Sequence, residues 1–189
     1  TTAMRVLGRA WEESGGTVLG LAPSAAAAAV LADEIGQATT VAKLLWELER
    51  GNRSDVDKVV TDSTLIILDE AGMTDTLSLA RLINYATSRG ASIRLVGDDR
   101  QLAAIGAGGV LRDIHRTHGA VILDEVLRFT DDGEKIATTA LRDGDPAALG
   151  WYLDHDRIHA GSREAAIEGV LTAWLTETRV IVGDPLSIA

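Results

Sequence analysis

The stretch that decides the fold is Leu65-Ile66-Ile67-Leu68-Asp69-Glu70-Ala71-Gly72-Met73. Its first four residues form a continuous apolar run, which predicts a central strand of a parallel sheet that is covered on both faces. Ligands of open α/β sheets bind at the carboxyl ends of such strands. Asp69 and Glu70 therefore stand where a functional site is expected.

Two adjacent carboxylates repel each other, so their pairing is costly unless a cation neutralises them. Magnesium with a bound nucleotide would meet this need. Asp69 would then orient the water shell of the metal, and Glu70 would polarise the attacking water. The alternative is that both acids stabilise the N-terminus of the following helix, where negative charge is favourable. The pair alone leaves both interpretations open.

A second apolar strand, Ile93-Arg94-Leu95-Val96-Gly97, runs into Asp98-Asp99-Arg100-Gln101-Leu102. Between the two strands lies a stripe with the spacing of a helix face, and Gly90 closes that helix. The stripe consists of Leu79, Leu82, Ile83 and Ala86. This βαβ unit places both polar segments on the same sheet edge. Gln101, which can donate and accept hydrogen bonds, suits a group that senses a γ-phosphate or a water; a solvated loop glutamine is the alternative.

These segments carry a family resemblance. Leu68-Asp69-Glu70-Ala71-Gly72-Met73 resembles the Walker B motif of superfamily 1 helicases, and Val96-Gly97-Asp98-Asp99-Arg100-Gln101-Leu102 resembles their motif III. Within that superfamily the chain is most similar to the RecD-like branch and to the helicase part of TraI/TrwC-type (MobF-like) conjugative relaxases of actinobacterial plasmids. Residues 104–113 and 141–146 extend this similarity over nearly the whole chain. The resemblance implies a RecA-like P-loop NTPase core, ATP and Mg²⁺ as cofactors, and a nucleotide-binding role for Asp69 and Asp98.

The resemblance also assigns the N-terminal residues. A Walker A loop ends in Gly-Lys-[Ser/Thr] and cradles the phosphates of a nucleotide. We expect Thr1 and Thr2 to follow this loop immediately, with Thr1 as a magnesium-binding hydroxyl; the loop and its lysine are then missing from the chain. The alternative is that Thr1 is an ordinary helix cap. The stripe expected to face the core from the first helix is Ala3, Val6, Leu7 and Ala10.

Pro23 and Ser24 follow a predicted strand at Thr17–Ala22 and resemble motif Ia, which contacts the single-stranded DNA backbone in the family. Hydroxyl and backbone N–H groups can meet a phosphate. However, residues 25–29 are all alanine, without the glycine and the basic residue of the family pattern. The alternative is a helix start that is rich in the best helix-forming residue.

The segment at residues 121–129 resembles motif IV, in which an arginine approaches the γ-phosphate. Arg128 is the expected arginine, because a cation there would stabilise the charge that develops in phosphoryl transfer. A surface salt bridge from Arg128 to Asp124 or Glu125 is the alternative.

The amino-acid composition excludes several kinds of site and segment. The chain of 189 residues contains no cysteine, which excludes disulfides and thiolate zinc sites. His115 and His118 could share a helix face, but without a third recognisable ligand ordinary surface histidines are the favoured interpretation. No stretch approaches the roughly 20 apolar residues of a membrane span, and no signal-peptide pattern opens the chain. We expect a cytoplasmic bacterial protein.

The net charge of −10 is unusual for a protein that grips nucleic acid, because DNA affinity comes largely from phosphate neutralisation. Lysine and arginine residues do not cluster along the chain. The main grip on DNA is therefore expected elsewhere in a larger protein.

The order of predicted elements defines an α/β fold with a mainly parallel sheet and a helical C-terminal extension. Parallel strands are expected near residues 17–22, 64–69, 92–97 and 120–124, and a helix with Val41, Leu44, Leu45 and Leu48 facing inward is expected over Thr40–Gly51. Later helices are expected at Glu134–Arg142, Pro146–Asp154 and Ser162–Thr176. The expected domains are a RecA-like motor domain at 1–125, a helical connector at 126–178, and the first strand of a second RecA-like domain at 179–189.

Two functional hypotheses remain. In the first, the chain is the N-terminal motor domain of an ATP-dependent single-stranded-DNA translocase or helicase in conjugative plasmid transfer. Its partners would be single-stranded DNA and, in the same polypeptide, a relaxase domain and a second RecA-like domain; alone it would be inactive. In the second, it is a degenerate RecA-like module that serves as a docking scaffold in a DNA-transfer complex.

Overall fold

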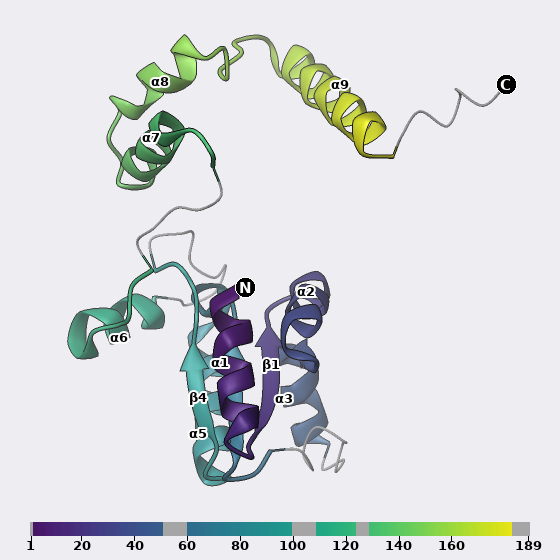
Figure 1. Ribbon diagram of the computed structural model, residues 1–189, viewed down its shortest axis with the longest axis vertical. Coiled ribbons are helices and arrows are strands. Elements are labelled where there is room, and N and C mark those ends of the chain that lie inside the picture. Colours follow the sequence, from purple (N-terminus) through teal and green to yellow (C-terminus); the bar gives the residue numbers. More distant parts are fainter. Residues whose placement is uncertain (1, 51–59, 100–108, 124–128, 183–189) are drawn as a thin grey trace, which may run out of the picture. The chain divides into compact units, whose positions relative to one another are not determined.

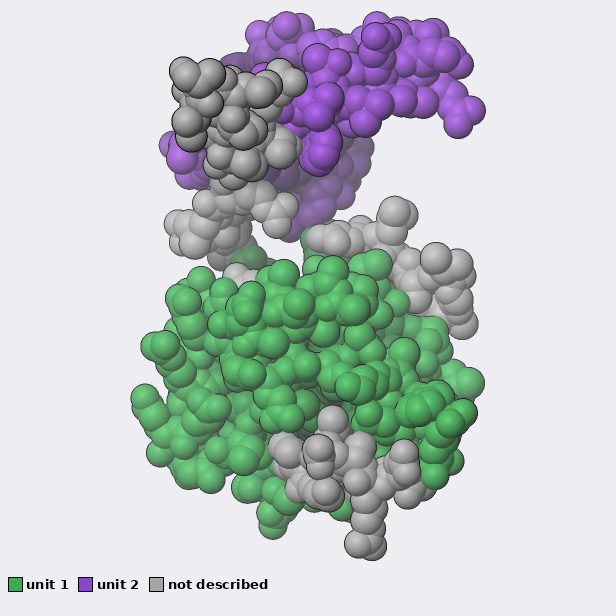
Figure 2. All heavy atoms as spheres, turned by 90° about the vertical axis from the view of Figure 1, so that its right-hand side faces the viewer, with its two compact units in different colours: residues 1–123 green, residues 124–189 purple. Residues whose placement is uncertain are grey.

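The computed structural model describes residues 2–50, 60–99, 109–123 and 129–182 (Figure 1). The chain divides into two compact units, residues 1–123 and 124–189, which Figure 2 colours separately. The first unit contains the sheet, and the described part of the second is helical.

A four-stranded parallel sheet in the order β2-β1-β3-β4 forms the centre of the first unit. Its strands are β1 (Thr17–Ala22), β2 (Ala38–Thr40), β3 (Thr64–Leu68) and β4 (Ser92–Leu95). Leu68 pairs with Leu21 on one side and with Leu95 on the other, so the strands end together. The arrowheads in Figure 1 mark this carboxyl edge. The structure confirms the predicted α/β class and its mainly parallel sheet.

Alternation along β3 explains why both sheet faces are covered. Ile66 and Leu68 pack into one apolar cluster, whereas Leu65 and Ile67 pack into the other, and all four are fully buried. The first cluster includes α3 (Val41–Glu49) and α5 (Thr76–Ser88). The second includes α1 (Thr2–Glu13) and α2 (Ala25–Ile35). A continuous apolar run is the expected consequence of burial on both faces.

The predicted inward stripes of α3 and α5 are confirmed, because their residues are buried or pack against the first cluster. The predicted stripe of α1 is wrong in phase. Ala3, Val6 and Ala10 are exposed, and the inward residues are Met4, Leu7, Gly8 and Trp11. Both stripes contain Leu7 and have helical spacing. Burial of the larger Met4 and Trp11 removes more apolar area from water than burial of alanines, which decides between them.

Gly20 allows α2 to lie close against the sheet. A β-carbon at Gly20 would lie 2.8 Å from each of three side-chain atoms, on Leu31 and Ile35 of α2 and on Ala38 of β2. The side chain of any other residue would push these elements away from β1. Glycine in a strand interior commonly marks such a close approach.

Several strand predictions need correction. The short strand β2, at Ala38–Thr40, was not among the predicted strands. Residues 120–123 form no strand, and Val121 is 95% exposed. In the described part of the chain this run has no strand to pair with, and an apolar sequence without a partner gains no ladder hydrogen bonds. Strands β3 and β4 end at Leu68 and Leu95, slightly earlier than predicted.

The described helices of the second unit are α7 (Asp132–Arg142), α8 (Ala148–Asp154) and α9 (Arg163–Val182). Thr138 of α7 and Tyr152 of α8 share a hydrogen bond of 2.8 Å between their hydroxyls. Pro146 lies in the turn before α8, not inside the helix. Residues 179–182, where a strand was predicted, continue α9, because a helix satisfies its backbone internally without a partner strand. Among the described helices, none combines the length and apolar character that crossing a bilayer requires.

Candidate functional site

The carboxyl edge of the sheet brings together the polar segments that follow β1, β3 and β4. The ladder continues one residue past the strand ends, because the Asp69 N–H donates to the Leu21 carbonyl at 2.9 Å and the Val96 N–H donates to the Leu68 carbonyl at 2.8 Å. The N-terminus of α1 lies at the same edge (Figure 1). Backbone N–H groups at a helix N-terminus attract anions such as phosphate.

Asp69 is held by its own chain neighbour. Its Oδ1 accepts a hydrogen bond from the Glu70 backbone N–H at 3.0 Å, and the side chain is half-buried. This bond fixes the orientation of the carboxylate directly beyond the central strand β3. Its second oxygen, Oδ2, takes no part in the bond. A carboxylate oxygen fixed in this way is a suitable partner for the water shell of a hard cation such as Mg²⁺.

Glu70 adopts a left-handed backbone conformation, with φ 51° and ψ 39°. This conformation costs a residue with a β-carbon about 1–2 kcal/mol, and such strain gathers at functional sites. Glu70 makes no side-chain capping bond to the short 3₁₀ helix η1 (Ala71–Met73), and the cap of α5 is Asp75.

The loop after β3 and the loop after β4 pack backbone against backbone. The Ala71 N–H donates to the Val96 carbonyl at 2.9 Å. A β-carbon at Gly97 would lie 3.2 Å from the Ala71 nitrogen and 3.4 Å from the Gly72 nitrogen. One at Gly72 would lie 3.4 Å from the Asp98 carbonyl oxygen. The two resembled motifs are therefore in direct contact, as the predicted βαβ unit requires.

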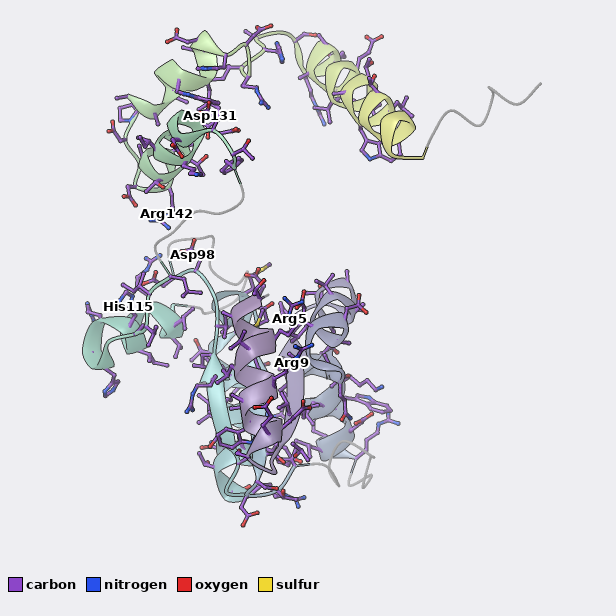
Figure 3. The ribbon with its side chains drawn as sticks, viewed as in Figure 1. Arg5, Arg9, Asp98, His115, Asp131 and Arg142 are labelled. Carbon is purple, nitrogen blue, oxygen red and sulfur yellow. The ribbon has the colours of Figure 1, made fainter. Side chains whose placement is uncertain are left out.

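The other predicted site residues have different outcomes. Asp98 is half-buried in the loop after β4 (Figure 3), and Thr2 is exposed in the first turn of α1. Pro23 and Ser24 follow β1, and Ser24 Oγ caps α2 by accepting the Ala27 N–H at 3.2 Å. This segment is therefore a helix start, as the alternative interpretation held. The Ser24 hydroxyl accepts a bond in the cap but keeps its own O–H, which is able to donate to a phosphate. Thr1, Gln101 and Arg128 lie outside the described residues.

The contacts of Asp99 with helix α6 (Val110–His118) were not predicted from the sequence. Arg112 donates to the Asp99 carbonyl, and His115 Nδ1 lies 2.8 Å from Asp99 Oδ2. The signal was present, because Arg112 and His115 are three residues apart and share a helix face. Only the fold shows that this face meets the loop after β4.

Asp75 ends the segment that follows β3 and caps the N-terminus of α5. Its side chain accepts the Ser78 N–H at 3.0 Å. Hydrogen bonds from Ser78 hold the pKa of Asp75 below its ordinary value of 3.8. A lowered folded-state pKa gives stability that is present above the unfolded-state pKa and is lost as pH falls through the folded-state pKa.

We therefore expect Asp75→Asn to keep the cap, since asparagine caps helices well, but to lose this pH-dependent contribution. The stability advantage of the wild type should be present at neutral pH and should be lost as pH falls from about 3.8 through the lower folded-state pKa. Chemical denaturation of both proteins across pH 2 to 7 measures it. A difference that stays constant over that range would contradict the assignment.

The carboxylates at the carboxyl edge of the sheet suit a metal ion that binds together with a nucleotide. Within the described part of the chain, no three His, Asp or Glu side chains gather into a metal-holding group. Magnesium in phosphate-transfer sites is bound by one or two carboxylates, by waters and by the phosphates themselves. Asp69 can supply that carboxylate share without a preformed cage.

The parallel sheet, its helices on both faces and the acids beyond its central strand define an α/β domain of the RecA-like P-loop class. The chain belongs to the AAA domain family, whose model matches residues 1–163.

Three curated relatives are conjugal transfer proteins. The chain is 34% identical to "Conjugal transfer protein TraA" of Rhizobium radiobacter over 177 residues, which cover 92% of this chain and 16% of that protein. It is 38% identical to "Probable conjugal transfer protein TraA" of Sinorhizobium fredii and 32% identical to the TraA of Agrobacterium fabrum, with the same coverage. The chain thus spans about a sixth of the length of these relatives.

Proposed function

We propose that this chain is the N-terminal motor domain of an ATP-dependent single-stranded-DNA translocase or helicase that acts in conjugative plasmid transfer. The observation that carries the proposal is the fixed Asp69–Glu70 pair beyond β3, in contact with the loop after β4. Membership of the AAA domain family and the names of the TraA relatives support it.

The proposed roles follow the position of each residue. Asp69 would hold the water shell of Mg²⁺, with the Thr1 hydroxyl as a direct ligand, and Thr2 and Asp98 would contact the nucleotide. Glu70 would polarise the attacking water. Bound Mg²⁺ would neutralise charge on the nucleotide phosphates and so favour phosphoryl transfer.

The remaining proposed residues complete the cycle. Gln101 would sense the γ-phosphate, and Arg128 would stabilise the charge that develops on it. Pro23 and Ser24 would meet the single-stranded DNA backbone at the end of β1. In the larger protein, a second RecA-like domain and a relaxase domain would be the partners within the same polypeptide.

ATP hydrolysis by the full-length protein, with and without single-stranded DNA, tests the proposal. We expect DNA to stimulate hydrolysis, and Asp69→Asn to weaken the apparent affinity for magnesium by about 10- to 100-fold, as the loss of an outer-shell partner does.

Asp33→Asn is the matched control, because Asp33 is exposed on α2; it should behave as the wild type. Absence of DNA-stimulated hydrolysis in the wild type would refute the motor proposal. The scaffold hypothesis would then explain any remaining role in DNA transfer.

A further inference from the structure

Helix α6 is hydrogen-bonded to the loop after β4 through the backbone of Asp99. Arg112 donates Nε and Nη2 to the Asp99 carbonyl oxygen, at 3.0 and 2.7 Å. Two donors of one planar guanidinium converge on a single acceptor. A fork of this kind restricts the direction as well as the distance of its acceptor.

His115 holds the same residue by its side chain. The His115 Nδ1 lies 2.8 Å from Asp99 Oδ2, and the two side chains are 36% and 22% exposed. An ionised carboxylate only accepts hydrogen bonds, so Nδ1 carries the proton in this contact. Hydrogen bonds to an ionised group are about twice as strong as those between neutral groups.

Leu111 adds an apolar contact where the two site loops meet. A β-carbon at Gly97 would lie 3.2 Å from Leu111 Cδ2, and one at Gly72 would lie 3.8 Å from it. The leucine therefore covers both glycines at which the loop after β3 touches the loop after β4. Helix α6 contacts both loops at once, and Figure 3 shows His115 on this helix and Asp98 in the loop after β4.

We propose that Leu111, Arg112 and His115 form a latch that fixes the loop after β4 against the Asp69–Glu70 loop. Arg112 and His115 are then positioning residues for hydrolysis. They hold Asp99, which directly follows Asp98, and no direct contact with the nucleotide or the attacking water is proposed for them. The catalytic consequence rests on the proposed function, whereas the mechanical role of the latch does not.

A neighbouring ion pair on the same helix shows what distinguishes the latch. Arg116 pairs with Asp113 at 3.2 Å, and their side chains are 77% and 70% exposed. That pair lies within α6, and in the described part of the chain it joins the helix to no other element. Exposed pairs of this kind contribute little. Arg112 and His115 instead join α6 to Asp99 in the loop after β4, so removing either side chain frees this loop from the helix.

The test uses the full-length protein with four single variants: His115→Ala, His115→Asn, Arg112→Ala and Arg116→Ala. Asparagine keeps a donor near the place of Nδ1. We expect His115→Ala and Arg112→Ala to lower kcat of DNA-stimulated ATP hydrolysis by about tenfold, with KM for ATP nearly unchanged, because misplacement of a site by a fraction of an ångström suffices for such a loss. His115→Asn should recover most of kcat, and Arg116→Ala should match the wild type.

Amide hydrogen exchange of the segment Val96–Asp99 gives a readout that needs no ATP hydrolysis. Exchange should be about tenfold faster in His115→Ala than in the wild type, whereas exchange of β3 stays the same. A wild type without ATP hydrolysis would refute the proposed function, and exchange alone would then decide on the latch. Unchanged exchange of Val96–Asp99 in both alanine variants would overturn the latch. So would a His115→Asn variant that recovers neither kcat nor protection from exchange relative to His115→Ala.

Discussion

Glu70→Gln is expected to lower the kcat of DNA-stimulated ATP hydrolysis by about 10²–10⁴-fold in the full-length protein, the range for loss of a general base. Glutamine matches glutamate in size but cannot accept a proton. Because Asp69, and not Glu70, is proposed to hold the metal, binding of magnesium-ATP should survive. Steady-state hydrolysis and calorimetric binding of a slowly hydrolysed ATP analogue measure the two effects separately.

Glu13→Gln is a matched control for this experiment. Glu13 is exposed at the last position of α1, far along the helix from the edge where Thr2 lies. The same chemical change there should leave kcat within about twofold, since it removes one surface charge that lies away from the site. Wild-type turnover in Glu70→Gln would show that another residue polarises the water.

Leu82→Ala is expected to reduce the free energy of unfolding by about 2–5 kcal/mol, the range for deleting a buried leucine side chain. Leu82 is fully buried in the cluster between α5 and the sheet. Removing its side chain loses apolar contact and leaves a cavity that the neighbouring strands fill only in part. Denaturation by urea, followed by far-ultraviolet circular dichroism, measures the change.

Leu77→Ala provides the control on the same helix, because Leu77 is 70% exposed. Both variants make the same chemical change in the same helix, and they differ chiefly in the burial of the leucine. We expect Leu77→Ala to stay within about 0.5 kcal/mol of the wild type. Equal losses in the two variants would contradict the placement of α5 on the sheet.

Strong periodicity explains which elements could be predicted from sequence. The leucine stripe of α5 has helical spacing, and the apolar run before Asp69 has the short length of a buried strand. In α1 the small residues Ala3 and Ala10 fit more than one phase, so the wrong face was selected. Strand β2 has only three residues, Ala-Thr-Thr, and exists because β1 pairs with it. Such a strand is a product of tertiary structure.

Some residues of the candidate site could be predicted from the sequence, and others only from the fold. Asp69 and Glu70 could be found because they directly follow a strong strand. Only the structure shows that Glu70 makes no side-chain capping bond and that the cap of α5 is Asp75. The contacts of His115 and Arg112 with Asp99 join segments separated by more than ten residues. The sequence places Arg112 and His115 on one helix face, but only the fold shows that this face meets Asp99.

The left-handed backbone of Glu70 implies a conflict between stability and activity at this position. Glycine adopts that conformation without a steric cost, so a sequence optimised for stability alone would place glycine there. A glycine would also remove the carboxylate that we propose as the water-polarising group. The domain thus gives up a small amount of folding free energy at Glu70, which is the trade-off expected where a reactive group occupies a strained site.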